Sequence, residues 1–148
     1  MIEINIANQT LKFADKTYSI SSAKNGIGEI EGSFCTPTGR FKIAEKIGGE
    51  LEAGAVLVGR VPTGEVFSPA LLHENPDRDW ILTRILWLEG VEIHNQNTKE
   101  RYIYIHGTPD EVPMGVPGSK GCIRMRNQAL IAMFDTVEVG EDVVIMEQ

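Results

Sequence analysis

A histidine and a cysteine in the last third of the chain are the residue types that nucleophilic catalysis requires. His106 and Cys122 lie 16 positions apart, each has a glycine neighbour, and prolines lie between them. A cysteine attacks as its thiolate, and a nearby imidazole can accept the thiol proton. The separation is too long for one helical turn, so only the fold could bring the two side chains together.

A strand and a wide loop must position this pair. Residues 101–105 (RYIYI) are rich in aromatic and β-branched types, which favours a strand that ends at His106. Residues 108–118 contain prolines and glycines and predict a wide loop that returns the chain to Cys122. Taken alone, a cysteine between glycine and isoleucine is more often a small buried apolar residue. A histidine at a strand end can equally well bind a turn carbonyl.

Two motifs around the pair resemble the signature of the L,D-transpeptidase (YkuD-like) catalytic domain family, whose members act on bacterial cell-wall peptides. They are HGT at 106–108 and SKGCIR at 119–124, and the segments TPTGRF at 36–41 and RILWL at 84–88 also match. Together the matches run from about residue 25 to the C-terminus, and in the His-to-Cys signature the order, the spacing and the flanking glycines all agree. One position departs from the pattern, because the family usually has histidine where this chain has Lys120.

The resemblance implies a role for each residue of the pair and its neighbours. Cys122 would be the nucleophile, and His106 would take its proton and return it to the leaving amine. The carbonyl of Gly107 would orient the imidazole, a task that an Asp or Asn side chain performs elsewhere. The successive N–H groups of Gly121 and Cys122 could form an oxyanion hole. No metal or cofactor is implied.

Three polar side chains around the cysteine are candidates for substrate binding. Arg124 is a fork-shaped donor suited to a substrate carboxylate, and a solvated surface ion pair is the alternative. Ser119 either hydrogen-bonds in the site or merely turns the chain. Lys120 could raise the thiolate fraction of Cys122, because a nearby positive charge favours the anion.

The most apolar stretch, residues 80–88, contains both tryptophans and predicts a buried strand through the core. Arg84 lies within it, and a charge in a buried strand needs a partner. Either Arg84 pairs with a carboxylate such as Glu74, or it faces the anionic groups of a substrate.

Period-two alternation of apolar residues predicts strands along most of the chain, and only one helix. Residues 127–135 predict that short helix, with Asn127 as its N-cap, and we assign no firm structure to residues 66–78. We expect a single domain over residues 1–148. Its fold should be mainly β, an antiparallel β-sandwich or closed sheet with one short helix, as the resemblance also implies. The expected strands are residues 2–6, 11–13, 18–20, 41–47, 55–61, 80–88, 101–105, 137–139 and 143–146.

Composition excludes several partners. The formal net charge of −7 disfavours nucleic acid, whose phosphates require clustered lysine and arginine. Residues 1–6 lack the features of a signal peptide, and no stretch reaches the roughly 20 apolar residues of a membrane-spanning helix. We therefore expect a cytoplasmic protein with no membrane partner, in which Cys35 and Cys122 are free thiols.

A zinc site built from the three histidines and the cysteines is the cofactor-based alternative. The histidines are His73, His94 and His106. Neither a CxxC pair nor an HxH cluster is present, so the spacing gives this alternative little support.

The function that these observations favour is a cysteine-dependent L,D-carboxypeptidase of cell-wall recycling. In the family, the thiolate attacks the carbonyl at the L-centre of the diamino acid in a tetrapeptide stem and expels the terminal D-alanine. Its partner would be a muropeptide or murein tetrapeptide, and a leaderless chain would meet soluble fragments, so water would resolve the acyl-enzyme. The alternatives are an L,D-transpeptidase, which passes the acyl group to an amine, and a catalytically inactive muropeptide-binding module.

Overall fold

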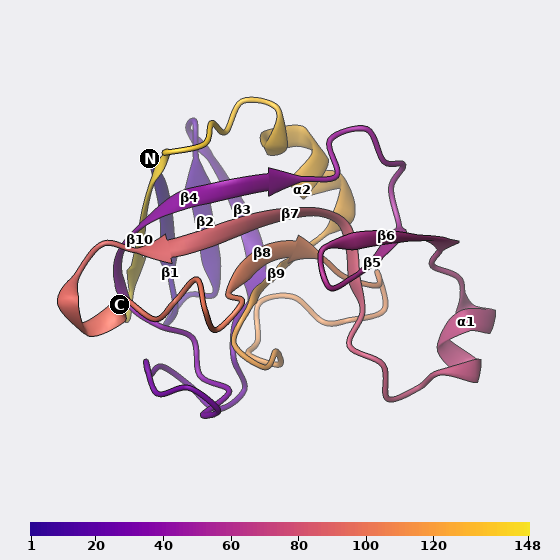
Figure 1. Cartoon of the computed structure of the whole chain (residues 1–148), viewed down its shortest axis with the longest axis horizontal. Coiled ribbons are helices and arrows are strands. Elements are labelled where there is room, and N and C mark those ends of the chain that lie inside the picture. The colour runs from indigo at the N-terminus through magenta and orange to yellow at the C-terminus, as the bar shows by residue number, and fades with distance from the viewer.

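The computed structural model describes residues 1–148, in which ten strands form one sheet accompanied by two α-helices and a short 3-10 helix, η1 (Figure 1). The elements in chain order are β1 (Ile2–Asn5), β2 (Thr10–Phe13), β3 (Lys16–Ser21), β4 (Gly39–Ile47), β5 (Ala55–Val58), β6 (Val61–Val66), α1 (Pro69–Glu74), β7 (Ile81–Gly90), η1 (Ile93–Asn95), β8 (Tyr104–Gly107), β9 (Ile123–Met125), α2 (Asn127–Phe134) and β10 (Asp142–Met146).

Strand pairing closes most of the sheet into a barrel. In the order β4-β10-β1-β2-β3-β9-β8-β7 each strand is hydrogen-bonded to the next, and β4 also pairs with β7. The hairpin of β5 and β6 extends from β7 outside this ring, on the side of α1 in Figure 1. Most pairs are antiparallel, but β1 with β10 and β8 with β9 are parallel. The prediction of a mainly β fold with a closed sheet is confirmed.

Alternating apolar residues fill the inside of the barrel. In β1, Ile2 and Ile4 are fully buried while the alternate residues, Glu3 and Asn5, are partly exposed, as a strand with one face on the core requires. One cluster of 19 buried apolar residues joins the barrel strands to α2, which contributes Leu130, Met133 and Phe134. Because α2 also contacts β7 and β8, the helix covers the barrel beside β8, which contains His106, and its neighbour β7.

Two segments between residues 55 and 78 differ from the sequence prediction. The single strand predicted over 55–61 is wrong: the chain reverses at Gly59 and Arg60, both at positive φ, and makes the β5–β6 hairpin. A left-handed pair of residues is what a tight two-residue hairpin turn requires. Within 66–78 the structure has the short helix α1, which begins where Ser68 Oγ accepts the N–H of Leu71.

Two further segments near the C-terminus also differ. The strand predicted over 137–139 is wrong, because the N–H of Val137 bonds to Met133 and Phe134 in the turn after α2, while its side chain is buried in the core. Asn127 does not cap α2: the N-cap position is Arg126 and no side chain makes the capping bond. The amide of Asn127 is instead engaged beside His106, as described below.

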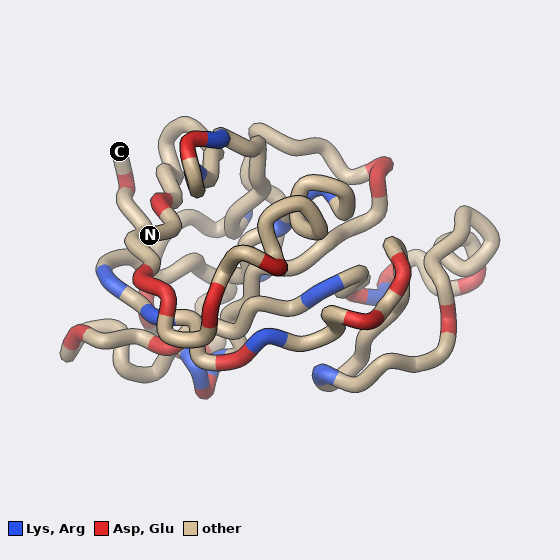
Figure 2. The backbone as a smooth tube through the Cα atoms, turned by 90° about the horizontal axis from the view of Figure 1, so that it is seen from above, with Lys and Arg blue, Asp and Glu red and all other residues tan.

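Charge is distributed over the whole surface. Figure 2 shows acidic and basic residues interspersed along the backbone, with the acidic ones more numerous, in keeping with the net charge of −7. Neither α1 nor α2 has the length and hydropathy of a membrane-spanning helix.

Candidate active site

The pairing of β8 with β9 brings the histidine and the cysteine together. The two strands are parallel, with Ile105 opposite Ile123 and His106 opposite Arg124. Ile105 and Ile123 point into the barrel core, and since side chains alternate along a strand, His106 and Arg124 point to the outer face. Cys122 immediately precedes β9, and its Sγ lies 3.4 Å from the backbone N of Tyr104. Two segments separated in sequence therefore present their polar residues to one pocket.

Cys122 is a half-buried free thiol held by the backbone of the neighbouring chain segment. Its Sγ accepts the N–H of Tyr104 and donates to the carbonyl of Tyr102, both at 3.4 Å. Burial, with a smaller contribution from the negative charge of Asp79, raises the pKa of the thiol to about 12. The Tyr104 N–H and the positive charges of Arg124 and Arg101 act in the opposite direction. At neutral pH the resting side chain is therefore a neutral thiol.

His106 is 2% exposed and is oriented by the carbonyl of the next residue. Its Nδ1 lies 2.6 Å from the Gly107 oxygen. A carbonyl only accepts hydrogen bonds, so Nδ1 carries the hydrogen and Nε2 has a free lone pair. Burial lowers the pKa of His106, and the charge of Arg124 lowers it as well. The resting imidazole is therefore neutral, and Nε2 is its proton-accepting atom. No hydrogen bond joins it to Cys122 Sγ, which is bonded to Tyr102 and Tyr104 instead.

Asn127 and Thr83 pack closely against the backbone at Gly107. Asn127 Nδ2 donates to the carbonyl of Thr108 at 3.0 Å, and its Oδ1 accepts the hydroxyl of Thr83 at 2.6 Å. Thr83 is fully buried at a φ of 74°, an outlier for a β-branched residue, and lies in an irregular stretch of the β7–β8 pairing. These contacts leave no space at Gly107, where a Cβ would lie 2.2 Å from Asn127 Oδ1.

The loop before Cys122 has its own internal hydrogen bonds. Ser119 Oγ donates to the carbonyl of Cys122 at 2.6 Å and accepts the N–H of Gly121 at 3.2 Å. Gly121 has a φ of 128°, and Thr36 donates to its carbonyl. Because the Gly121 N–H is engaged by Ser119, the N–H of Cys122, which has no partner within the protein, is the better placed of the two expected oxyanion donors.

Cys122 and His106 open into a pocket of about 570 Å³, a size typical of small-molecule sites. Three arginines line it, and none is paired with a carboxylate. Arg60 donates to the Tyr104 hydroxyl, Arg101 to two backbone carbonyls and Arg124 to the Gly118 carbonyl. The pocket is lined by Glu31, Gly32, Phe34, Gly59, Arg60, Asp79, Ile81, Glu100, Arg101, Tyr102, Ile103, Tyr104, His106, Ser119, Lys120, Cys122 and Arg124.

The match to a family model decides the relationship of this chain to known proteins. The model of the L,D-transpeptidase catalytic domain (YkuD) matches residues 1–145. The chain belongs to this family. The HGT and SKGCIR segments contribute His106, Ser119, Lys120, Cys122 and Arg124 to the pocket lining, whereas TPTGRF and RILWL contribute no residue to it.

Solved L,D-transpeptidases share the fold at low identity. One from Mycobacterium smegmatis has 19% identity and a TM-score of 0.62, over 98% of this chain and 57% of that one. Another, from Xylanimonas cellulosilytica, has 19% identity and a TM-score of 0.60, over 97% of this chain and 58% of that one. The chain thus spans less than two thirds of these structures. No curated protein matches its sequence.

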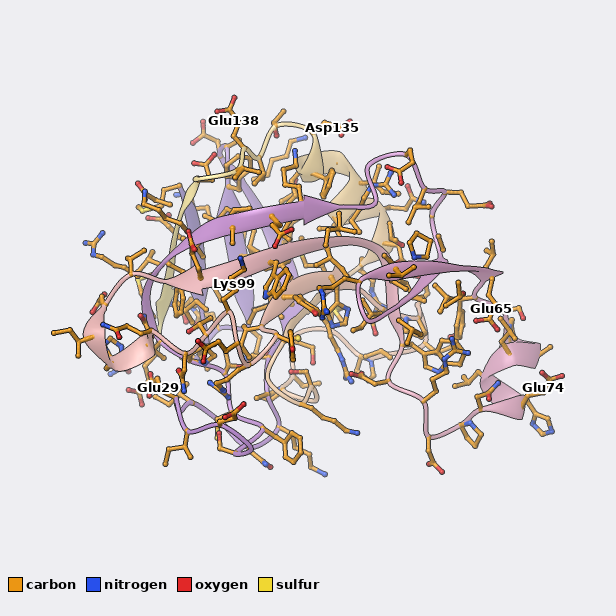
Figure 3. The ribbon with its side chains drawn as sticks, viewed as in Figure 1. Glu29, Glu65, Glu74, Lys99, Asp135 and Glu138 are labelled. Atoms are coloured by element: carbon orange, nitrogen blue, oxygen red, sulfur yellow. The ribbon has the colours of Figure 1, made fainter.

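Of the four predicted substrate-binding residues, three line the pocket and one does not. Those that line it are Ser119, Lys120 and Arg124. Lys120, at the position of the usual L,D-transpeptidase histidine, lines the pocket as an exposed side chain, and the largest cationic effects on Cys122 come from Arg124 and Arg101. Arg84 does not line the pocket: it donates to the carbonyls of Leu51 and Thr83. The prediction that Arg84 faces substrate or pairs with Glu74 is therefore wrong. Figure 3 shows Glu74 on the distant helix α1.

Sequence reasoning missed five charged residues of the pocket, namely Glu31, Arg60, Asp79, Glu100 and Arg101. Asp79 follows a segment without clear pattern, and Arg101 precedes a strand without a motif of its own. The hairpin turn at Gly59 and Arg60 could have been found, because glycine and one further residue between apolar runs is a hairpin signal, but that signal does not place Arg60 at the pocket. The three histidines lie on separate elements, and no group of three or more potential metal ligands comes together.

Proposed function

We propose that this protein is a cysteine L,D-carboxypeptidase that removes the terminal D-alanine from murein tetrapeptides. The observation that carries the proposal is that His106 lines the same pocket as Cys122 while its Nδ1 is held by the Gly107 carbonyl, which leaves Nε2 as the atom that can accept a proton. A pocket that is lined by arginines without carboxylate partners suits a peptide with several carboxylates.

The reaction starts from a neutral pair. The Cys122 thiol proton moves to His106 Nε2 as Sγ attacks the carbonyl carbon of the diamino acid, and the oxygen becomes an anion that the Cys122 N–H can bind. When the intermediate collapses, the C–N bond to D-alanine breaks and His106 returns the proton to the leaving amine. A thioester to Cys122 remains.

Hydrolysis completes the cycle. Neutral His106 takes a proton from a water molecule as the water oxygen attacks the thioester carbon. The C–S bond then breaks, and His106 returns the proton to the Cys122 sulfur. The tripeptide leaves with a new carboxylate. A thiol that is protonated at rest avoids an isolated buried anion, whose cost is high.

The space around the nucleophile supports water as the acceptor. Beside the main pocket lies a smaller one of about 150 Å³, whose lining shares Asp79, Lys120 and Arg124 with it. The larger pocket suits one stem peptide, and the smaller one has room for a few waters but falls below the usual range for a peptide-sized ligand. Because the pocket suits a single released stem, we assign the enzyme to the turnover of cell-wall fragments.

Transpeptidation is the second candidate, and family membership favours it. The same thioester would then be attacked by an amine of a second stem or of a D-amino acid. The two reactions share every step up to the thioester, so the geometry of Cys122 and His106 serves both.

Product analysis distinguishes the two candidates. A diaminopimelate-containing tetrapeptide is incubated with the protein, with and without excess D-amino acid or tripeptide, and the products are weighed by mass spectrometry. We expect free D-alanine and tripeptide in every case. If cross-linked dimer or exchange product dominates instead, the carboxypeptidase assignment is wrong and the protein is a transpeptidase. The Cys35→Ala variant should match the wild type, whereas Cys122→Ala should release no D-alanine.

A further inference from the structure

Arg60 occupies a backbone position that disfavours its residue type. It forms the turn of the β5–β6 hairpin with Gly59, and the two residues have φ values of 68° and 56°. Such turns favour glycine or asparagine, because a Cβ in the left-handed region crowds the following carbonyl oxygen. Strain of this kind at a pocket wall suggests a functional role for the side chain.

The guanidinium of Arg60 lies over two aromatic rings, and the side chain is only partly exposed. Its guanidinium carbon is 4.8 Å from the centre of the Tyr102 ring and 4.9 Å from that of Trp87, and Nη1 donates to the Tyr104 hydroxyl at 2.9 Å. These contacts fix the plane of the guanidinium but use one of its five N–H groups. No carboxylate is paired with it.

The residues that hold Arg60 also hold the nucleophile. The Tyr102 carbonyl and the Tyr104 N–H both contact Cys122 Sγ. Arg60 lies over β7 and β8, whereas Arg124 lies on β9 opposite His106. The two cations therefore line the pocket from different elements, Arg60 from the β5–β6 turn and Arg124 from β9. A substrate bound to Cys122 could contact both.

We propose that Arg60 forms a carboxylate-binding subsite for the acyl-donor peptide, distinct from the place of the leaving D-alanine. Arg124 is adjacent to His106, which protonates the leaving amine, so it suits the D-alanine carboxylate that is attached to that amine. The carboxylates left for Arg60 are that of the distal centre of the diamino acid and the α-carboxylate of the γ-linked glutamate. This inference rests on the proposed function.

Singly amidated substrates test the subsite. D-Alanine release is measured for the free tetrapeptide, for peptides with one or the other of these two carboxylates amidated, and for a peptide amidated at D-alanine. For the free peptide, Arg60→Gln should lower kcat/KM by about 10- to 100-fold, mainly through KM. Amidation of the carboxylate that Arg60 binds should cause a similar loss in the wild type and none in the variant. The amide that causes this loss identifies which of the two carboxylates Arg60 binds.

Two further variants separate the subsite from the stability of the hairpin. Lys99→Gln removes another cation from the Trp87 ring, at 5.0 Å, outside the pocket, and should leave discrimination among the four peptides unchanged (Figure 3 labels Lys99). Arg60→Lys keeps the charge without the fork and should lose only part of the effect. If Arg60→Gln slows all four peptides equally or none, the subsite does not exist.

Equilibrium binding keeps this test independent of turnover. If the wild type released no D-alanine from any peptide, the proposed function would fail. The four peptides would then be titrated calorimetrically into Cys122→Ala protein with and without Arg60→Gln. Tighter binding of one carboxylate than of its amide, lost with Arg60, supports the subsite; equal binding, or none, overturns it.

Discussion

Replacement of Gly107 by alanine should damage both the fold and the site. The added Cβ would lie 2.2 Å from Asn127 Oδ1, 2.7 Å from the Leu82 carbonyl oxygen and 3.1 Å from Thr83 Cβ. Non-bonded heavy atoms prefer about 3.5 Å, so Oδ1 would have to move by roughly 1 Å. Overpacking of this kind costs about 1–3 kcal/mol, and loss of the two Asn127 hydrogen bonds adds about 1–3 kcal/mol. We expect Gly107→Ala to lower the free energy of unfolding by about 2–6 kcal/mol.

Chemical denaturation and steady-state kinetics measure the two effects together. A shifted Gly107 carbonyl no longer orients the His106 imidazole, so the folded fraction of the variant should have a lower kcat. Gly49→Ala is the control, because its Cβ approaches only a Phe134 ring carbon, at 3.3 Å, and it should cost less than about 1 kcal/mol. The double variant Gly107→Ala, Asn127→Ala should be less destabilised than the sum of the single variants. Wild-type stability and turnover in Gly107→Ala would refute this reasoning.

Three further predictions concern charge and the loop before the nucleophile. Because burial lowers the pKa of His106 in the free enzyme, and the base must be neutral, kcat/KM should stay constant from neutral pH downwards and fall only below the ordinary histidine value of about 6.5; a fall that begins above it would contradict this assignment. Alkylation of Cys122 by iodoacetamide should be slow at pH 7 and rise with pH without a plateau below pH 9, and Arg124→Met should slow it more than Lys120→Met, since removing a nearby cation raises the thiol pKa; a larger effect of Lys120→Met would reverse the assignment. Ser119→Ala removes a donor to Cys122 and an acceptor of Gly121, and should lower the melting temperature by several degrees and slow turnover; an unchanged kcat would show that the loop is held by other contacts.

Much of the site was predictable because its chemistry is local in sequence. The HGT and SKGCIR motifs specify His106 and Cys122. The strand predicted over 101–105 is right only from Tyr104, because Arg101 and Tyr102 form a turn and β8 runs from Tyr104 to Gly107. The parallel pairing of β8 with β9, which brings the two together, was not predictable, since the three-residue strand β9 is too short to show a period. Its existence depends on partners on both sides.

The supporting residues were harder to predict because tertiary contacts override local preference. Asn127 has the sequence context of a helix cap, yet its amide has buried partners in Thr83 and Thr108. Arg84 appeared to require a carboxylate, but backbone carbonyls satisfy part of it and the Phe134 ring lies 5.6 Å away. Arg60 has no feature that marks it as a pocket residue until the hairpin folds over β7 and β8.

The thioester on Cys122 is the most direct test of the central claim. Intact-protein mass spectrometry, on samples quenched with acid within the first turnovers of a diaminopimelate tetrapeptide, should show an adduct of the peptide mass less D-alanine. Peptide mapping should place it on Cys122, and it should decay to free tripeptide in water. An absent adduct together with undiminished D-alanine release, or the same adduct and turnover in Cys122→Ala, would contradict covalent catalysis by this cysteine.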